Sequence, residues 1–281
     1  MTGRTFELIQ KYAVSPVPIL ILGEPGTGKE KTAKLLYRTG DYRAKPLFIV
    51  DCAAVRSSEW EQLMLADDSP FAVLDTAIHL KDLDALGAQD IQLFFQYAKT
   101  TGFLRRNRVT LSMTLGSAHE AEIRPALLNE HRCIAFPLPP LRERVEELPN
   151  ILALYTNQMN VKFGKQIVGF SQEALARMTA YSWPRNLDQL HWVMREIALL
   201  TENAYVTAAT VETVLAKEEE LGHTDVAAAG LPGLRMDQTL EEMTYDIVCA
   251  VLAEEHGSKE RTAARLGIGR TTLWRILKNH E

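Results

Sequence analysis

The feature that most constrains this chain is a glycine-rich octapeptide between an apolar run and a helical pattern. The apolar run covers residues 18–22, and the helical pattern covers residues 31–37. In a strand, turn and helix of this order, glycines let backbone N–H groups turn onto an anion, and a lysine reaches the β- and γ-phosphates. We therefore predict a nucleotide-binding loop made of Gly23, Glu24, Pro25, Gly26, Thr27, Gly28, Lys29 and Glu30.

One position departs from the generic phosphate-loop pattern. A Ser or Thr normally follows the lysine and helps to hold Mg²⁺, whereas this chain has Glu30. On the generic pattern alone, the alternative interpretation is a surface turn that happens to be rich in glycine.

Composition sets the broad class. The chain has 281 residues, enough for two or three domains, and it is 46% hydrophobic and 24% charged, as soluble globular proteins are. Its longest apolar stretches are too short to cross a bilayer, so we expect no membrane partner. Three scattered cysteines (Cys52, Cys133 and Cys249) and seven histidines without ligand spacing argue against a disulfide framework or a zinc site. We expect a reducing compartment, the cytoplasm.

The first half of the chain alternates short apolar segments with helical patterns, one of which covers residues 88–99. Apolar strands that alternate with helices indicate a parallel sheet with helices on both faces. We therefore predict an α/β domain over residues 1–138. Its predicted strands are 18–22, 47–51, 71–75, 109–114 and 133–136.

A helical pattern replaces this alternation after the prolines at 137, 139 and 140. We predict a smaller helical domain over residues 139–222. Residues 223–235 contain alanine, glycine and proline without amphipathic spacing, and we predict a linker there. A third, all-α domain then covers residues 236–281. The predicted helices of the second domain are 146–164, 172–181, 187–200 and 207–220.

The third domain has the pattern of a helix-turn-helix, in which Ser258 begins one helix, Gly267 ends it, and residues 270–279 form the next. Residues 257–281 carry six lysines and arginines against two acidic residues, although the net charge of the chain is −5. Such a basic segment indicates a polyanionic partner. We predict double-stranded DNA, contacted by Arg270, Thr271, Thr272, Trp274, Arg275 and Lys278.

The alternative interpretation of this basic helix is a solvated surface that closes a small bundle. The preceding helix, within residues 237–255, has an acidic surface and an apolar stripe that is suited to joining two copies of the chain. A homodimer through the C-terminal domain would present two reading helices to a palindromic operator.

These segments together resemble one family, the sigma-54-dependent transcriptional activators, which are AAA+ proteins. Residues 51–54 (Asp-Cys-Ala-Ala) resemble the family's Asn-Cys-Ala-Ala, and residues 138–144 match its very specific Leu-Pro-Pro-Leu-Arg-Glu-Arg. Residues 183–187 resemble its Trp-Pro-Gly-Asn-Val, and the chain ending resembles a Fis-type DNA reader. The resemblance covers nearly the whole chain. It implies an α/β P-loop AAA+ domain, a helical lid and a Fis-type helix-turn-helix, with ATP or ADP and Mg²⁺ as cofactors.

Departures from the family pattern affect its ATPase. Glu is common after the family's loop lysine, so Glu30 is ordinary there. Family members end the third strand with Asp-Glu, of which Asp helps to hold magnesium and Glu polarises the attacking water. With the third strand predicted at 71–75, Asp75 is retained as a nucleotide and Mg²⁺ ligand, but Thr76 replaces the Glu and cannot act as a carboxylate base.

Further departures lie at polar and charged positions. Leu115 replaces the sensor Asn after the fourth strand. Glu130 aligns with the arginine that reaches the neighbouring subunit, and Asp188 aligns with the lid arginine, so both charges are reversed. Arg124 aligns with a second family arginine, and Arg132 is nearby but displaced. A missing arginine finger alone costs about 10³–10⁵ in rate, so we expect weak hydrolysis.

One absence concerns partners. Only 20 residues, 55–74, separate Ala54 from Asp75, and they contain nothing like the family's Gly-Ala-Phe-Thr-Gly-Ala loop that engages sigma-54. We therefore doubt contact with sigma-54, while contact with another form of RNA polymerase and simple occlusion of DNA both stay open. A higher AAA+ oligomer also stays open.

We expect a DNA-binding transcriptional regulator whose AAA+ module binds ATP and hydrolyses it weakly or not at all, with no catalytic residue assigned. Two alternatives stay open. The first is an active ATPase that remodels sigma-54 RNA polymerase, and the second is a nucleotide-sensing scaffold that tunes an intact homologue.

Overall fold

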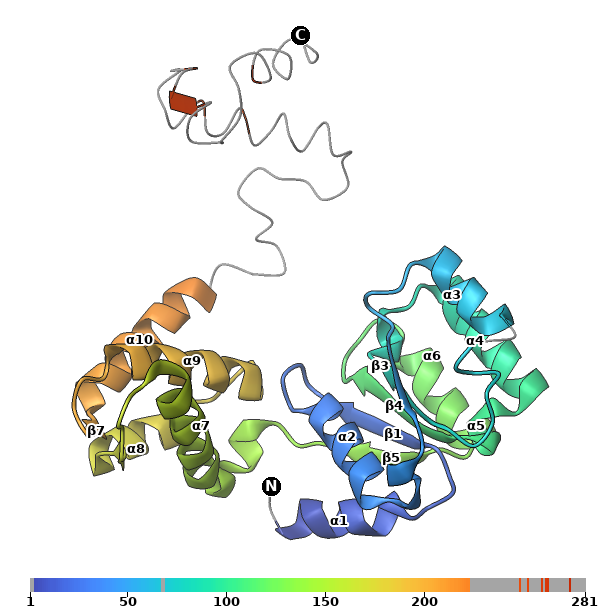
Figure 1. The fold of residues 1–281 in the computed structure, drawn as a ribbon, viewed down its shortest axis with the longest axis horizontal. Helices are drawn as coiled ribbons and strands as arrows, with labels where there is room; N and C mark the ends of the chain where they lie inside the picture. The colour runs from blue at the N-terminus through green and yellow to red at the C-terminus, as the bar shows by residue number, and fades with distance from the viewer. Residues whose placement is uncertain are drawn as a thin grey trace. The chain divides into compact units, whose positions relative to one another are not determined.

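A parallel sheet organises the N-terminal part of the computed structural model, which describes residues 3–66 and 69–222 and the single residues 248, 252, 259, 261, 262 and 273. Within these residues the sheet has five strands in the order β2-β3-β4-β1-β5 (Figure 1). All neighbouring strands are parallel, which confirms the predicted sheet type. The strands are β1 (Ile19–Gly23), β2 (Leu47–Asp51), β3 (Ala77–Lys81), β4 (Arg108–Thr114) and β5 (Ile134–Pro137).

Helices cover both faces of this sheet, as predicted. Alternate side chains of β1 separate the two cores, because successive residues of a strand point to opposite faces. Ile19 and Ile21 pack in one core with α1 and α2, while Leu20 and Leu22 belong to the other, larger core. The helices are α1 (Gly3–Ala13), α2 (Lys29–Thr39), α3 (Ser57–Leu65), α4 (Ala88–Thr101), α5 (Phe103–Arg106) and α6 (Glu120–Pro125).

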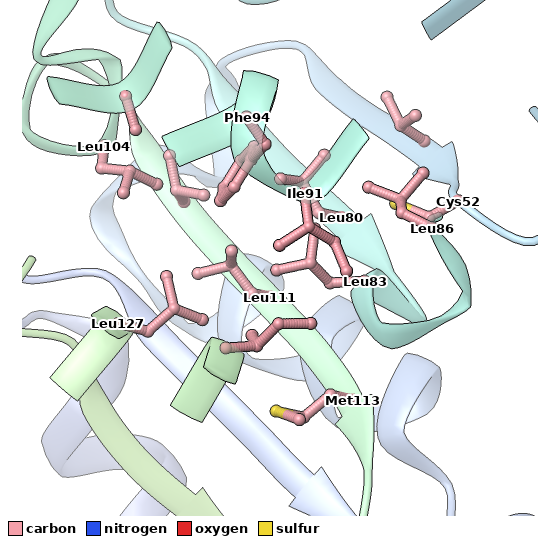
Figure 2. Close-up of a cluster of buried hydrophobic side chains, with 14 of the residues drawn as sticks. Cys52, Leu80, Leu83, Leu86, Ile91, Phe94, Leu104, Leu111, Met113 and Leu127 are labelled. Carbon is pink, nitrogen blue, oxygen red and sulfur yellow. The ribbon is translucent and has the colours of Figure 1, made fainter. Parts of the chain in front are cut away.

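The larger core lies between the sheet and helices α3 to α6. Figure 2 shows Leu80 of β3 and Leu111 of β4 close to Ile91 and Phe94 of α4. These side chains are fully buried, so each contributes roughly 1.5–3 kcal/mol of hydrophobic stabilisation. The rigid sheet that results holds the carboxyl ends of its strands in fixed positions.

The predicted helical second domain is confirmed, with one small addition. Its four helices are joined by a parallel pair of two-residue strands, β6 (Gly169–Phe170) and β7 (Tyr205–Val206). Ser171 begins α8 by accepting a hydrogen bond from the N–H of Ala174 at 3.1 Å. The helices are α7 (Leu148–Phe163), α8 (Gln172–Ala180), α9 (Asn186–Leu200) and α10 (Ala208–Gly222). Short helical segments elsewhere are η1 (Asp41–Ala44), η2 (Leu83–Ala85), η3 (Ala126–Glu130), η4 (Leu141–Glu143) and η5 (Val145–Glu147).

The prediction of the third strand at residues 71–75 was wrong. Residues 69–75 form turns, because the N–H of Ala72 donates back to the carbonyl of Ser69 at 3.0 Å. Phe71 is buried among aromatic rings and does not lie in a sheet: its centroid is 5.4 Å from that of Phe103. The true strand, β3, begins six residues after Phe71 and contains a histidine and a lysine, which hid it in an apolarity search.

The chain divides into two compact units, Met1–Val214 and Leu215–Glu281. The predicted linker at 223–235 and most of the predicted domain at 236–281 lie outside the described residues. The domain boundaries at 138/139 and 222/223 stay predictions. So do the predicted DNA contacts of Arg270, Thr271, Thr272, Trp274, Arg275 and Lys278, which all lie outside the described residues.

Candidate nucleotide-binding site

The glycine-rich loop joins the carboxyl end of β1 to the first residue of α2, as the sequence predicted. Gly26 and Gly28 have φ angles of +75° and +97°, a backbone region that side chains rarely adopt. A Cβ atom on Gly26 would lie 2.3 Å from the carbonyl oxygen of Arg185, so only glycine fits there. Thr27 closes the turn, because its hydroxyl donates to the carbonyl of Glu24 at 2.8 Å.

Lys29 is the first residue of α2, and its side chain lies back along the loop. Its Nζ donates to the carbonyl oxygens of Gly23 at 3.3 Å and Glu24 at 3.4 Å, and to Oγ1 of Thr114 at 3.1 Å. Burial lowers the pKa of Lys29, and the charge of Asp82, whose Oδ1 lies 4.0 Å from Nζ, opposes that shift. A buried ammonium held mainly by neutral oxygens is suited to an incoming phosphate.

Two polar residues lie at the carboxyl end of β3, at the same edge of the sheet as the loop, because the carboxyl ends of parallel strands meet there. Lys81 is the last residue of β3, and its Nζ lies 2.5 Å from Oδ2 of Asp51 at the end of β2. Asp82 comes next, with its N–H bound to the hydroxyl of Ser112 at 3.0 Å. Burial raises the pKa of Asp82, while Lys29 acts in the opposite direction.

A cavity of about 530 Å³ opens between the loop, the ends of β3 and β4, and the start of α9. Four lysines and three carboxylate side chains line it, so cations and anions face the same space. The lining residues are Pro25, Gly26, Gly28, Lys29, Glu30, Lys31, Lys34, Lys81, Asp82, Ser112, Thr114 and Asp188. The glycine-rich turn, the buried lysine and this cavity together fit the phosphates of a nucleotide.

The second domain contacts the loop through a set of polar groups that we call the clasp: Glu24, Arg142, Arg144, Asn186 and Leu187. Two Arg142 nitrogens donate to the Glu24 carboxylate at 2.8 and 2.5 Å. Asn186 donates to the carbonyl of Pro25 at 2.9 Å and accepts from the N–H of Leu141 at 2.7 Å. The clasp also includes hydrogen bonds of 2.9 Å from Arg144 to the carbonyl of Thr27 and from the N–H of Leu187 to the carbonyl of Gly26.

Asp188 brings a carboxylate from α9 to the cavity. A Cβ atom on Gly26 would lie 3.2 Å from its Oδ2, which places the acid directly beside the phosphate loop. It also contributes to the electrostatic environment of Lys29. The resemblance predicted that Asp188 replaces a lid arginine, and the structure places it at the cavity.

Asp75 does not join this site. It precedes β3, so it lies at the amino end of a parallel strand, whereas the loop lies at the carboxyl edge of the sheet. Its carboxylate forms an ion pair with Lys45, and that hydrogen bond lowers the pKa of Asp75. Its assignment as a nucleotide and magnesium ligand rested on the mistaken strand, and Thr76 is likewise moved away from the third strand's carboxyl end.

Sequence reasoning missed Lys81, Asp82, Ser112 and Thr114 at the cavity. The available signal was the polar pair Lys81–Asp82 directly after the apolar residues of β3, but the buried His79 within that strand obscured it. Two other positions that the resemblance singled out, Leu115 and Arg124, lie on the surface. Leu115 follows β4 and is exposed, and Arg124 pairs with Glu120 on its own helix at 2.9 Å.

Two kinds of feature are absent from the residues that the structure describes. No group of three or more His, Cys, Asp or Glu side chains in that part of the chain is arranged to hold a metal ion. In the same residues no helix combines the length and apolarity needed to span a membrane.

Three protein-family models match the chain in succession. The sigma-54 interaction domain matches residues 1–66, the AAA+ ATPase lid domain matches residues 142–228, and the Fis family of bacterial regulatory proteins matches residues 239–280. The order of the three matches is the order expected from the sequence motifs.

Curated relatives are similar over almost the whole chain. The transcriptional regulatory protein ZraR of Klebsiella oxytoca is 26% identical over 291 residues, covering 94% of this chain and 64% of that protein. The DNA-binding transcriptional regulator NtrC of Rhizobium meliloti (strain 1021) is 24% identical over 329 residues, covering 97% and 68%. The chain spans about half to two-thirds of the length of the curated relatives it matches.

A solved structure supports the fold. NtrX from Brucella abortus in complex with ATP superimposes with a TM-score of 0.65 at 19% identity, covering 99% of this chain and 67% of that one. At this level of identity the likeness establishes the fold alone.

Proposed function

Because the chain belongs to the family of sigma-54-dependent transcriptional regulators, we propose that it is a DNA-binding regulator whose AAA+ module binds ATP and hydrolyses it slowly or not at all. One observation carries the proposal. The phosphate loop and Lys29 form a complete phosphate-binding cradle, but β3, which β4 separates from β1 in the sheet, ends in Lys81, where the family pattern has the Asp that helps to hold magnesium.

Binding is supported by the geometry of the loop. Gly26 and Gly28 adopt the conformations that turn backbone N–H groups inward, and Lys29 supplies a positive charge at the carboxyl edge of the sheet. These groups recognise phosphate through charge-assisted hydrogen bonds, which are stronger than neutral ones. The triphosphate of ATP is the ligand that this cradle suits best.

Slow hydrolysis follows from the groups that face the cradle. Phosphoryl transfer needs a residue that orients the attacking water and positive charges that stabilise the transition state. In the family pattern, Asp-Glu ends the third strand; here Lys81 and Asp82 occupy that end, and Asp82 is directed toward Lys29. Asp188 places negative charge where the family has a lid arginine. On the corrected strand the magnesium-binding Asp of the family pattern is replaced by Lys81, whereas Asp82 keeps a carboxylate, on a shorter side chain, at the position of the family's Glu.

The proposed output is binding to a palindromic DNA operator by a homodimer. The Fis-type match to residues 239–280 and the basic character of residues 257–281 support it. RNA polymerase is the partner that the family assignment favours. The segment between Ala54 and β3 contains α3 and the turn at 69–75, without the Gly-Ala-Phe-Thr-Gly-Ala sequence, so we propose no remodelling of sigma-54 through such a loop.

Nucleotide binding and turnover measured on one preparation test this function. We expect saturable ATP binding by calorimetry, with phosphate release at least about a thousandfold below the ~1 s⁻¹ at which enzymes commonly turn over. Lys29→Ala should abolish the binding, because no other side chain of the loop supplies a buried positive charge to the phosphates.

Lys11→Ala, a change on helix α1 outside the cavity lining, is the control and should bind ATP as the unmodified chain does. Turnover near ~1 s⁻¹ would contradict the slow-hydrolysis proposal and favour an active ATPase. Unchanged affinity in Lys29→Ala would show that the loop is not the binding site.

A further inference from the structure

We propose that Lys81 substitutes for the magnesium ion at this site, so that the chain binds nucleoside triphosphates without a divalent cation. This inference rests on the proposed nucleotide-binding function and concerns the charge that neutralises the bound phosphates.

Lys81 is held at the cavity by its position in the sheet. The parallel register of β2 and β3 places Asp51 directly beside Lys81, and the two side chains form an ion pair of 2.5 Å. Asp82 lies near the same ammonium, at 3.9 Å. Lys81 thus has a fixed positive charge at the carboxyl edge of the sheet, where it lines the same cavity as Lys29 and Gly28.

Two positions hold Mg²⁺ in a generic phosphate-loop site, and both have other residues here; Glu30 is common at the first position in the family that this chain resembles, so Lys81 at the second position is the departure that matters. Such a site uses a hydroxyl directly after the loop lysine and a carboxylate at the end of another strand of the same sheet. Glu30 follows Lys29, and its carboxylate is bound by Lys34 of the same helix at 2.5 Å. Lys81 ends that strand, β3. The residues present therefore do not fit a magnesium ion held in the usual way.

An ammonium at the strand end also disfavours a divalent cation directly. A divalent cation in this position would be repelled by the like charge of the ammonium, because charges near a protein surface are only partly screened. The same ammonium attracts phosphate oxygens. A lysine has three N–H donors, so the single bond from Lys81 to Asp51 leaves donors to face the cavity.

The hydrogen bond with Asp51 raises the pKa of Lys81, so its ammonium stays charged at neutral pH. Lys31 lines the cavity as well, and Lys34 also lines it but is paired with Glu30. The protein itself therefore supplies cationic groups around the phosphates, which in related chemistry a metal ion would help to neutralise.

The deciding experiment is calorimetric titration of the purified full chain with ATP, in excess Mg²⁺ and in excess EDTA at matched ionic strength. We expect the two dissociation constants to agree within about threefold. Binding more than about threefold weaker in EDTA would overturn the inference while leaving nucleotide binding intact. Absence of binding in both buffers would overturn the proposed nucleotide-binding function itself, and the inference with it.

Two substitutions sharpen the test. Lys81→Gln removes the charge and should weaken ATP binding in EDTA by about 10- to 100-fold, the usual contribution of a hydrogen bond between charged groups. Lys81→Asp restores a strand-end carboxylate, so binding should be lost in EDTA and regained when Mg²⁺ is added.

Lys45→Gln is the matched control. Lys45 is also paired with an aspartate, Asp75, but that pair lies outside the cavity lining, so this variant should bind ATP as the unmodified chain does in both buffers. Thermal unfolding of each variant establishes that it is folded. The comparison of the two buffers on the unmodified chain decides whether binding needs a divalent cation, and unchanged ATP affinity of Lys81→Gln in EDTA would overturn the role given to Lys81.

Discussion

His79 is a buried, titratable residue in the middle of the sheet. It lies in the middle of β3, is 1% exposed, and directs Nδ1 at the carbonyl oxygen and the hydroxyl of Thr110, at 3.2 and 3.1 Å. Burial lowers the pKa of His79 to about 4, because a charged imidazolium would lose its hydration there. The residue therefore stays neutral in the folded chain at any pH where the protein is expected to work.

The lowered pKa of His79 predicts acid sensitivity. The unfolded chain takes up a proton near the ordinary value of 6.5, whereas the folded chain does so only near 4. The folded state therefore loses stability as the pH falls from 6.5 to 4, by a total of about 3 kcal/mol, and gains nothing from His79 above that window. Denaturant unfolding of the unmodified chain and of His79→Leu across this range measures the difference.

In His79→Leu that part of the pH dependence should disappear, because leucine does not titrate. The matched control is His119→Gln, a change at a partly exposed histidine before α6, which should leave the slope as it is. Parallel stability curves for the unmodified chain and His79→Leu would contradict the assignment.

At the scale of elements, the clasp joins the loop after β1 to the segments that begin the second domain. In the clasp, Arg142, which precedes α7, forms a bidentate ion pair with Glu24 in the loop. Asn186, at the start of α9, binds the same loop with its side chain and adopts a positive φ of +52° to do so. The hydrogen bond from Arg142 lowers the pKa of Glu24. Since the loop is held from two elements, its conformation depends on both.

We predict a measurable coupling between Glu24 and Arg142. Glu24 is partly exposed and Arg142 is exposed, so a double-mutant cycle with Glu24→Gln and Arg142→Gln should give a small but measurable coupling in unfolding free energy. The coupling should be present above the ordinary pKa of 4.5 for a glutamate and be lost as the pH falls below the lowered value, because the carboxylate is then protonated.

Hydrogen exchange at the amides of Gly26 and Gly28 should become faster in either single variant. The more exposed pair Arg177–Glu212, 2.9 Å apart within the second domain, is the control and should give a smaller coupling. Equal couplings for the two pairs would argue that the clasp does not stabilise the loop.

At the scale of the whole molecule, the chain combines a nucleotide cradle with a segment matched by a Fis-type family model. The cradle belongs to the unit Met1–Val214, and the Fis-type match belongs to the unit Leu215–Glu281. The two proposed activities can therefore be altered separately by substitution, which makes the proposed function testable in parts.

We predict that Arg270→Ala combined with Arg275→Ala weakens operator binding and leaves ATP binding unchanged. Each arginine is predicted to contact phosphates or base edges, so the double variant should lose about 2–6 kcal/mol of DNA-binding free energy at fixed salt. Fluorescence anisotropy with labelled DNA measures this loss, and calorimetry with ATP checks the other unit. Unchanged DNA affinity would remove both residues from the interface.

The sequence by itself determined the phosphate loop, because its glycines, its lysine and its flanking strand and helix are all local features. It also determined most helices, since their periodicity follows from short-range geometry. It could not determine the third strand: the apolar residues 71–75 are as suitable for a strand as β3 is, and only the ladders with β2 and β4 decide between them.

Tertiary structure alone decided which charges surround the cradle. Lys81 and Asp51 are thirty residues apart and meet only because β2 and β3 pair in parallel register. Asp188 reaches the loop only because α9 begins beside Gly26. Chain-distant groups of this kind leave no periodic signal in the sequence, because their proximity results from packing the sheet and the second domain into one structure.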